Sequence, residues 1–290
     1  MRRRAGALLV FAAVTAVAVW LVSLALGEIR EADEAAPEPA TSAAQPPLDP
    51  LRIVFPEGFT RAEMAARITA VNEIAKSERG VTPKLSPRRY LALTRRHSLP
   101  GEFAGDDRPR QLEGFLFPAT YDFLPGTTTK KLVEDQLVAF QRAWAEVDLT
   151  YAKSKNLTAY DVLIIASMIE KETVVPRERR LVASVIYNRL RAGMALGIDA
   201  TIRYGLEVPG NEPLRQSQLT SDNPYNTRNR LGLPPTPIAN PGLSSIRAAA
   251  LPVETDYLYF VRKPDERSHF FTASESEFFR KACGYGYGCG

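Results

Sequence analysis

Two glutamates, Glu170 and Glu172, stand two residues apart at the end of an apolar run, in the stretch ASMIEKET at residues 166–173. A helix turns by about 100° per residue, so Glu172 projects within roughly 20° of Ile165 on its apolar side, whereas Glu170 points to nearly the opposite side. A carboxyl group on the buried side is partly desolvated, and this raises its pKa towards the range useful for proton donation. The spacing favours Glu172 as a general acid, and the alternative is that both glutamates are solvated residues of a last helical turn.

Other catalytic chemistry has little support in the sequence. Glu170 and Glu172 point to different sides of one helix, so they cannot flank one sugar bond as the two carboxylates of a glycosidase do. The chain has only two histidines, His97 and His269. These are too few for a multi-histidine metal site and leave few bases for a serine or cysteine nucleophile. We therefore expect carboxylate chemistry with no metal and no cofactor.

Capping signals predict the elements that position Glu172. Thr158 suits the start of a helix that runs through residues 159–172, and Pro176 opens the next helix, which Gly193 ends. Towards the N-terminus the sequence predicts a strand at 52–56, a helix capped by Thr60 and Glu63, and a helix after Ser86 and Pro87. Further along it predicts a strand and turn in 112–128, a helix at about 129–147, loops from 197, a short helix near 244–250 and a strand at 256–261.

The N-terminus carries an uncharged apolar run about as long as a bilayer core requires of a helix. Three arginines precede it and acidic residues follow it, so the positive-inside rule predicts a single-pass protein of the cell membrane with a cytoplasmic N-terminus and an extracytoplasmic catalytic domain. The alternative is a cleaved signal peptide, whose apolar part is usually shorter, ~7–15 residues. We predict a cytoplasmic stub at 1–4, a transmembrane helix at 5–27 and a disordered linker at 28–50.

The composition argues against a nucleic-acid partner. The net charge of +4 owes much to the three N-terminal arginines, and the sequence has no RNA-binding aromatic signature and no zinc-ligand spacing. The only cysteines, Cys283 and Cys289, lie in a tail at 276–290 that we expect to be flexible and that is rich in glycine and tyrosine. Outside the cytoplasm they could form a disulfide, or the thiols could stay unpaired in a loose tail.

Five stretches, taken together and in this order, resemble the membrane-anchored endolytic murein transglycosylase family, MltG or YceG-like. They are LEGFLFPATY at 112–121, ASMIEKET at 166–173, SVIYNRLRAGMALGIDATIRYG at 184–205, YNTRNRLGLPPTPIANPGLSSIRAA at 225–249 and YLYFV at 257–261. The resemblance implies an α+β fold in which a small LysM-like module at 51–95 precedes a mixed α/β catalytic domain at 96–275. Thr236 departs from the pattern, because a glycine is common at that position in the family.

The resemblance implies a lytic transglycosylase that cleaves the MurNAc–GlcNAc bond within peptidoglycan strands and leaves 1,6-anhydro-MurNAc ends. In similar enzymes a small hydroxyl residue follows the catalytic glutamate, as Thr173 follows Glu172 here. Glu172 would protonate the glycosidic oxygen and then take the proton of the C6 hydroxyl of MurNAc. The implied partners are glycan strands, the lipid bilayer through residues 5–27 and peptidoglycan synthases, and termination of nascent strands is a further expectation.

Motif position suggests eight residues for substrate binding: Glu113, Tyr121, Asn188, Thr201, Tyr204, Tyr225, Asn226 and Thr227. Structural roles are the alternative, namely packed aromatics for Tyr121 and Tyr204, an ion pair with Arg189 or another base for Glu113, and turn caps for Asn188 and Asn226.

Two other functions compete with a lytic transglycosylase. The first is a membrane-tethered, glycan-binding scaffold of the wall-synthesis machinery without catalysis. The second is a muramidase that hydrolyses the same bond with water, for which Asp199 or Asp222 could supply a second carboxylate. The chemical nature of the product end separates these three functions.

Overall fold

The structure is a computed structural model that describes residues 49–95, 99, 102–103 and 110–287. The described residues belong to one compact unit, Asp49–Gly290. The predicted stub, the transmembrane segment at 5–27 and nearly all of the predicted linker lie outside the described residues. In the part of the chain that is described, every helix is too short or too polar to cross a membrane.

The N-terminal part of the unit begins with strand β1 (Leu51–Val54), followed by helices α2 (Arg61–Arg79) and α3 (Pro87–Arg95), as the sequence predicts. The predicted capping box is present, because the Thr60 side chain accepts from the backbone of Glu63 and the Glu63 side chain accepts from the backbone of Thr60.

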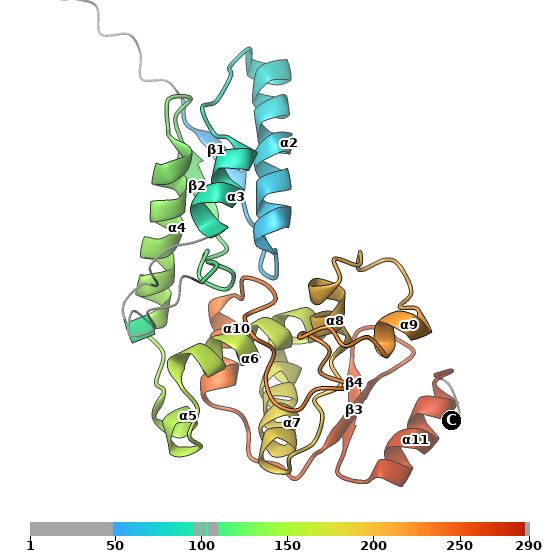
Figure 1. Cartoon of the computed structure of the whole chain (residues 1–290). Helices are drawn as coiled ribbons and strands as arrows, with labels where there is room; N and C mark the ends of the chain where they lie inside the picture. Colours follow the sequence, from blue (N-terminus) through green and yellow to red (C-terminus); the bar gives the residue numbers. More distant parts are fainter. Residues whose placement is uncertain (1–48, 96–98, 100–101, 104–109, 288–290) are drawn as a thin grey trace, which may run out of the picture. The chain divides into compact units, whose positions relative to one another are not determined.

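Strand β1 finds its partner outside this predicted module. It pairs antiparallel with β2 (Thr120–Phe123), with Leu51 opposite Phe123 and Val54 opposite Thr120. Helix α4 (Thr129–Trp144) packs against α3 (Figure 1). The predicted domain boundary near residue 95 stays a prediction. Both β1 and α3 contact elements that follow this boundary, namely β2 and α4.

Helix α6 (Ala159–Glu172) is the central element of the C-terminal part. Every residue from Val162 to Ile169 is buried, so the helix is surrounded by protein over two turns. It packs against α7 (Arg179–Arg191) and α10 (Leu243–Ala250), which Figure 1 shows beside it. The short helices α5 (Thr150–Ser154) and η2 (Pro176–Glu178) precede and follow α6.

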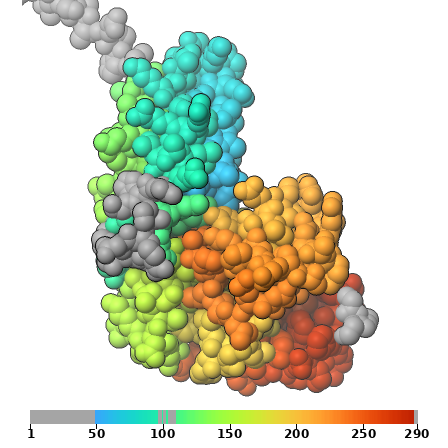
Figure 2. All heavy atoms as spheres, viewed as in Figure 1, coloured from blue at the N-terminus to red at the C-terminus, as the bar shows by residue number. Residues whose placement is uncertain are grey.

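The remaining elements follow α7 in the sequence. They are α8 (Asp199–Gly205), α9 (Gln216–Leu219), the antiparallel hairpin of β3 (Tyr259–Arg262) and β4 (His269–Thr272), and α11 (Glu275–Gly284). In the space-filling view of Figure 2, the segment from α8 to α10 covers much of the visible face of this part. The mixture of helices with two small antiparallel sheets confirms the predicted α+β class.

The structure differs from the sequence prediction in two elements. Only Thr120–Phe123 of the predicted strand in 112–128 is a strand, because Gly114 adopts φ +90° and the backbone around it turns. Helix α11 occupies most of the tail for which we expected flexibility. Cys283 lies in α11 and is disulfide-bonded, while Cys289 lies outside the described residues.

Candidate active site

Glu172 is the last residue of α6, and its surroundings favour an acid that can exchange a proton. Its side chain is partly exposed, and the backbone N–H of Ala200, in α8, donates a hydrogen bond to its carboxyl group. Burial raises the pKa of Glu172 to about 7, with Asp199 adding to the rise and Arg262 opposing it. A carboxyl group with this pKa populates both its protonated and its ionised form near neutral pH.

Glu170 lies on another side of the helix and has structural contacts. One of its carboxylate oxygens accepts a hydrogen bond from the backbone N–H of Gly242 at 3.0 Å. The other lies 3.9 Å from Nη2 of Arg179, and only 7% of the side chain is exposed. Glu170 therefore ties α6 to the start of α10, whereas the Glu172 carboxyl group receives its hydrogen bond from the start of α8.

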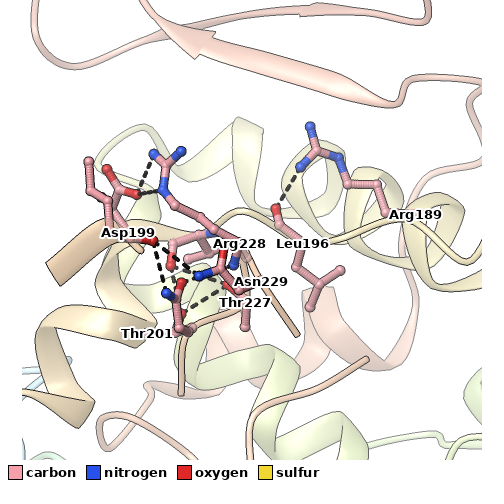
Figure 3. A network of polar contacts seen from close by, with 10 residues as sticks. Arg189, Leu196, Asp199, Thr201, Thr227, Arg228 and Asn229 are labelled. Carbon is pink, nitrogen blue, oxygen red and sulfur yellow. Dashed lines mark hydrogen bonds and ion pairs between the residues drawn. The ribbon is translucent and has the colours of Figure 1, made fainter. Parts of the chain in front are cut away.

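The start of α8 is held by two threonines whose hydroxyl groups lie 2.9 Å apart, Thr201 and Thr227 (Figure 3). The Thr227 hydroxyl also accepts from the backbone N–H of Ile198 at 3.0 Å, and the Thr201 hydroxyl donates to the Ile198 carbonyl at 2.6 Å. Both threonines are buried. We predicted them as substrate contacts, and that role stays a prediction; in the structure they fix the helix end whose Ala200 N–H reaches Glu172.

An ion pair lies at the same end of α8. Nε of Arg228 donates to Oδ1 of Asp199 at 2.7 Å, and both side chains are partly exposed (Figure 3). Asp199 is the first residue of α8 and the neighbour of Ala200, so this pair borders the Glu172 carboxyl group. Asp222, the other candidate for a second carboxylate, is 95% exposed and pairs with Arg230.

Glu113 is a second carboxyl group with a raised pKa, but it lies in the protein interior with 2% of its surface exposed. It accepts hydrogen bonds from the backbone of Arg61 at 3.0 Å, from Nδ2 of Asn240 at 2.8 Å and from the Tyr204 hydroxyl at 3.1 Å. Burial raises its pKa to about 7, and the Arg61 charge opposes the rise. Arg189, the base we named as its ion-pair partner, instead donates to backbone carbonyls, including that of Leu196 (Figure 3).

The three tyrosines predicted to bind substrate make internal contacts. Tyr204 packs edge-to-face on Tyr225 with ring centroids 5.2 Å apart. The Tyr225 hydroxyl lies 2.8 Å from that of Thr236, so the threonine that departs from the family pattern has a partner in this chain. Tyr121 donates to the Phe117 carbonyl at 2.7 Å, far along the chain from the Glu172 region.

The two asparagines hold loops. Nδ2 of Asn188 donates to the carbonyls of Thr255 and Tyr257, both at 2.9 Å. Nδ2 of Asn226 donates to the carbonyls of Leu219 and Ser221, at 3.0 and 2.8 Å. Each asparagine thus satisfies two carbonyls in part-buried hydrogen bonds, as the structural alternative for these residues describes.

The sequence motifs did not single out Arg228 and Arg262, the two cations whose charges act on Glu172. Arg228 lies inside one of the five motif stretches and Arg262 directly follows another. Their position in or next to a motif stretch is the one signal in the sequence, and other arginines of the chain have the same position. Their proximity to Glu172 arises from chain segments that meet only in the folded protein.

A cavity of about 520 Å³ lies elsewhere, at the N-terminal end of α6, and its lining includes Phe103, Tyr160, Leu233 and Pro234. Glu172, at the opposite end of α6, does not line it. Among the described residues no group of three or more His, Cys, Asp or Glu side chains could hold a metal ion.

The chain belongs to the YceG-like family, which matches it over residues 25–283. It is similar to proteins named endolytic murein transglycosylase. One is from Bacillus subtilis (strain 168), with 33% identity over 73% of this chain and 59% of the relative. Another is from Streptococcus pneumoniae (strain ATCC BAA-255 / R6), with 31% identity over 78% of this chain and 43% of the relative. The chain therefore spans less than two thirds of the length of these relatives.

The fold also has a solved counterpart. A crystal structure of a yceG-like protein from Listeria monocytogenes superimposes with a TM-score of 0.61 at 30% sequence identity. The match covers 79% of this chain and 75% of that chain.

Proposed function

We propose that this protein is an endolytic lytic transglycosylase that cleaves the MurNAc–GlcNAc bond of peptidoglycan strands and leaves 1,6-anhydro-MurNAc ends. The observation that carries the proposal is Glu172, a partly exposed residue at the end of a buried helix whose carboxyl group has a pKa of about 7. The names of the curated relatives support the reaction class.

In the proposed reaction the protonated Glu172 gives its proton to the glycosidic oxygen as the bond from that oxygen to C1 of MurNAc breaks. The resulting carboxylate then accepts the proton of the C6 hydroxyl, whose oxygen forms the new bond to C1. The Ala200 N–H stabilises the carboxylate between the two steps. Glu172 ends the cycle protonated, so one carboxyl group is sufficient.

Hydrolysis is the second candidate, because one observation favours it. Asp199 lies close enough for its charge to raise the pKa of Glu172, and a muramidase requires a second carboxylate to act with the acid. Asp199 is held by Arg228, which favours an electrostatic role over attack on substrate or water. Hydrolysis leaves reducing ends, whereas the proposed reaction leaves anhydro ends.

The test is to incubate the full-length chain with purified peptidoglycan and to identify the product ends by mass spectrometry. Glu172→Gln keeps the shape of the side chain and removes its exchangeable proton, and Glu170→Gln is the matched control in the same helical turn. We expect anhydro-MurNAc ends from the unaltered chain and from Glu170→Gln, and none from Glu172→Gln. Reducing ends would establish the hydrolase, and binding without cleavage would establish the scaffold.

The proposal extends to the place of action. The apolar run at 5–27 supports a single-pass anchor in the cell membrane, with the folded unit outside the cytoplasm. There the enzyme would act on strands near the synthases, terminate nascent strands, and dock on glycan through its LysM-like module. Protease added to intact spheroplasts should digest the folded unit and leave a membrane-bound N-terminal fragment, and recovery of the intact chain would contradict this orientation.

A further inference from the structure

Arg262 is an exposed cation beside the proposed acid. It is the last residue of β3, its side chain is exposed, and its charge is the foremost one that lowers the pKa of Glu172. Among the described residues none makes a hydrogen bond or ion pair with its guanidinium. Arg228, the other cation that acts on Glu172, is already engaged with Asp199.

The hairpin that carries Arg262 is fastened close to the end of α6. Arg262 lies directly opposite His269 across the hairpin, so the two side chains share one face. His269 is buried and donates its backbone N–H to both Glu178 oxygens at 3.1 Å, while its Nδ1 lies 2.8 Å from one of them. Glu178 ends η2, six residues after Glu172, so these contacts join the hairpin to the segment that follows α6.

The entry to β3 is fastened as well. Arg189 donates to the carbonyl of Leu258 at 2.6 Å and to that of Leu196 at 2.6 Å. It thereby joins the residue before β3 to the segment before α8, the helix whose Ala200 N–H reaches Glu172. Arg262 is consequently a long side chain on a rigid support, with an unused planar fork of donors that fits a carboxylate.

We propose that Arg262 binds a carboxylate of the substrate beside the scissile bond, so that the enzyme selects glycan strands whose side groups carry free carboxylates. This proposal rests on the proposed function. The carboxylate has two possible sources, since a peptide stem carries its own, and a strand stripped of its stems exposes the lactyl carboxylate of MurNAc. Binding of the anion neutralises a cation that acts on Glu172, and recognition of the strand is thereby coupled to the acid.

The test compares full-length Arg262→Gln with the unaltered chain on three strands: one with intact stems, one stripped of stems, and one whose stem carboxylates are converted to carboxamides. Arg267→Gln is the control, because Arg267 is an exposed arginine in the turn of the same hairpin. On a carboxylate-bearing strand we expect kcat/KM of Arg262→Gln to fall about tenfold, equivalent to ~1.4 kcal/mol. On the carboxamide strand we expect no loss in kcat/KM.

A loss confined to the strand with intact stems identifies the stem carboxylate, and a loss on the stripped strand identifies the lactyl carboxylate. Equal losses on all three strands, or no loss on any, would overturn the proposal. Affinities of the same strands for Glu172→Gln, with and without Arg262→Gln, give a readout that needs no catalysis. If the unaltered chain produces no anhydro ends, the proposed function fails, and these affinities still decide whether Arg262 binds the anion.

Discussion

At the scale of single residues, Glu113 and Glu172 both have a carboxyl pKa of about 7, and burial is the main cause in each case. Their surroundings nevertheless differ. Glu113 is enclosed and accepts from three internal donors, which gives it a structural role in this fold. Glu172 keeps exposed surface and stands beside Arg262, whose guanidinium has no partner among the described residues. A raised pKa alone does not distinguish a catalyst from a buried structural acid, whereas exposure does.

The pH dependence of cleavage should follow the ionisation of Glu172. Four groups face its carboxyl group: Arg262 from β3, Asp199 and the Ala200 N–H from α8, and Arg228 from the loop after α9. Because the reaction begins with protonated Glu172, kcat/KM should fall about tenfold per pH unit above pH ~7. Arg262→Gln removes a charge that lowers the pKa, so the descending limb should move to higher pH.

Asp199→Asn should move the same limb to lower pH, since Asp199 raises the pKa of Glu172. Rates of anhydro-end formation measured between pH 5 and 9 give these limbs, with Arg267→Gln as the control that leaves them in place. Shifts in the same direction for Arg262→Gln and Asp199→Asn would contradict the assignment of the limb to Glu172.

Glu113 should affect stability rather than the pH profile of cleavage. A carboxyl group whose pKa is raised from 4.5 to about 7 in the folded state stabilises that state at low pH, and the contribution is lost as pH rises from 4.5 through 7. The full difference corresponds to at most ~3 kcal/mol. Glu113→Gln cannot ionise, so its unfolding free energy should change less between pH 5 and 8, measured by urea unfolding. An unaltered slope would show that Glu113 is not the group responsible.

At the scale of elements, α8 determines the geometry of the site. Its first turn carries Asp199 and the Ala200 N–H, both of which act on Glu172, and its last turn carries Tyr204, which donates to Glu113. Helices of this length are not stable alone, so the contacts at the two ends must hold α8 in place. The Thr201–Thr227 pair secures the first turn.

Thr227→Val should therefore impair catalysis through position. Valine keeps the shape of threonine but cannot accept from the Ile198 N–H or pair with Thr201, and a lost buried hydrogen bond costs ~1–3 kcal/mol. We expect kcat to fall about tenfold or more, because displacement of a reacting geometry acts mainly on the chemical step. KM should change little, and thermal unfolding should show a modest loss of stability.

Thr220→Val serves as the control, because the Thr220 hydroxyl donates only to the Gln216 carbonyl, on an exposed helix. If Thr227→Val raised KM while kcat stayed constant, Thr227 would be a substrate contact, as the sequence analysis expected.

At the scale of the whole molecule, residues 51–95 and the rest of the unit share a core. Strand β1 depends on β2 for its hydrogen bonds, Tyr90 of α3 donates to Gln136 of α4 at 2.8 Å, and Arg61 donates to Glu113. These contacts join chain segments on either side of the predicted boundary near residue 95.

A chain that begins at residue 96 should therefore fail to fold, because β2 would lose its partner strand β1 and Glu113 would be exposed. Thermal unfolding followed by circular dichroism should show no cooperative transition for this fragment, in contrast to the full-length chain. A cooperative transition with intact cleavage activity would establish residues 51–95 as a separable module, as the sequence analysis expected.

The sequence by itself determined what depends on near neighbours along the chain. The cap at Thr158, the apolar face of residues 159–172 and the opposite directions of Glu170 and Glu172 all follow from helical geometry and local hydrogen bonding. The motif stretches likewise identified the family, which the match over residues 25–283 confirms.

Only the tertiary structure decided the roles of the polar residues around Glu172. The motif suggested Thr201, Thr227, Asn188 and Asn226 as substrate contacts. Their hydrogen-bond partners lie 26 residues away for the threonine pair, 67 and 69 residues away for Asn188, and 7 and 5 residues away for Asn226. The raised pKa of Glu172 and the position of Arg262 beside it depend on chain segments that are more than 20 residues apart in the sequence and meet only in the fold. Burial and electrostatic interactions act through space, so a linear pattern of residues does not contain them.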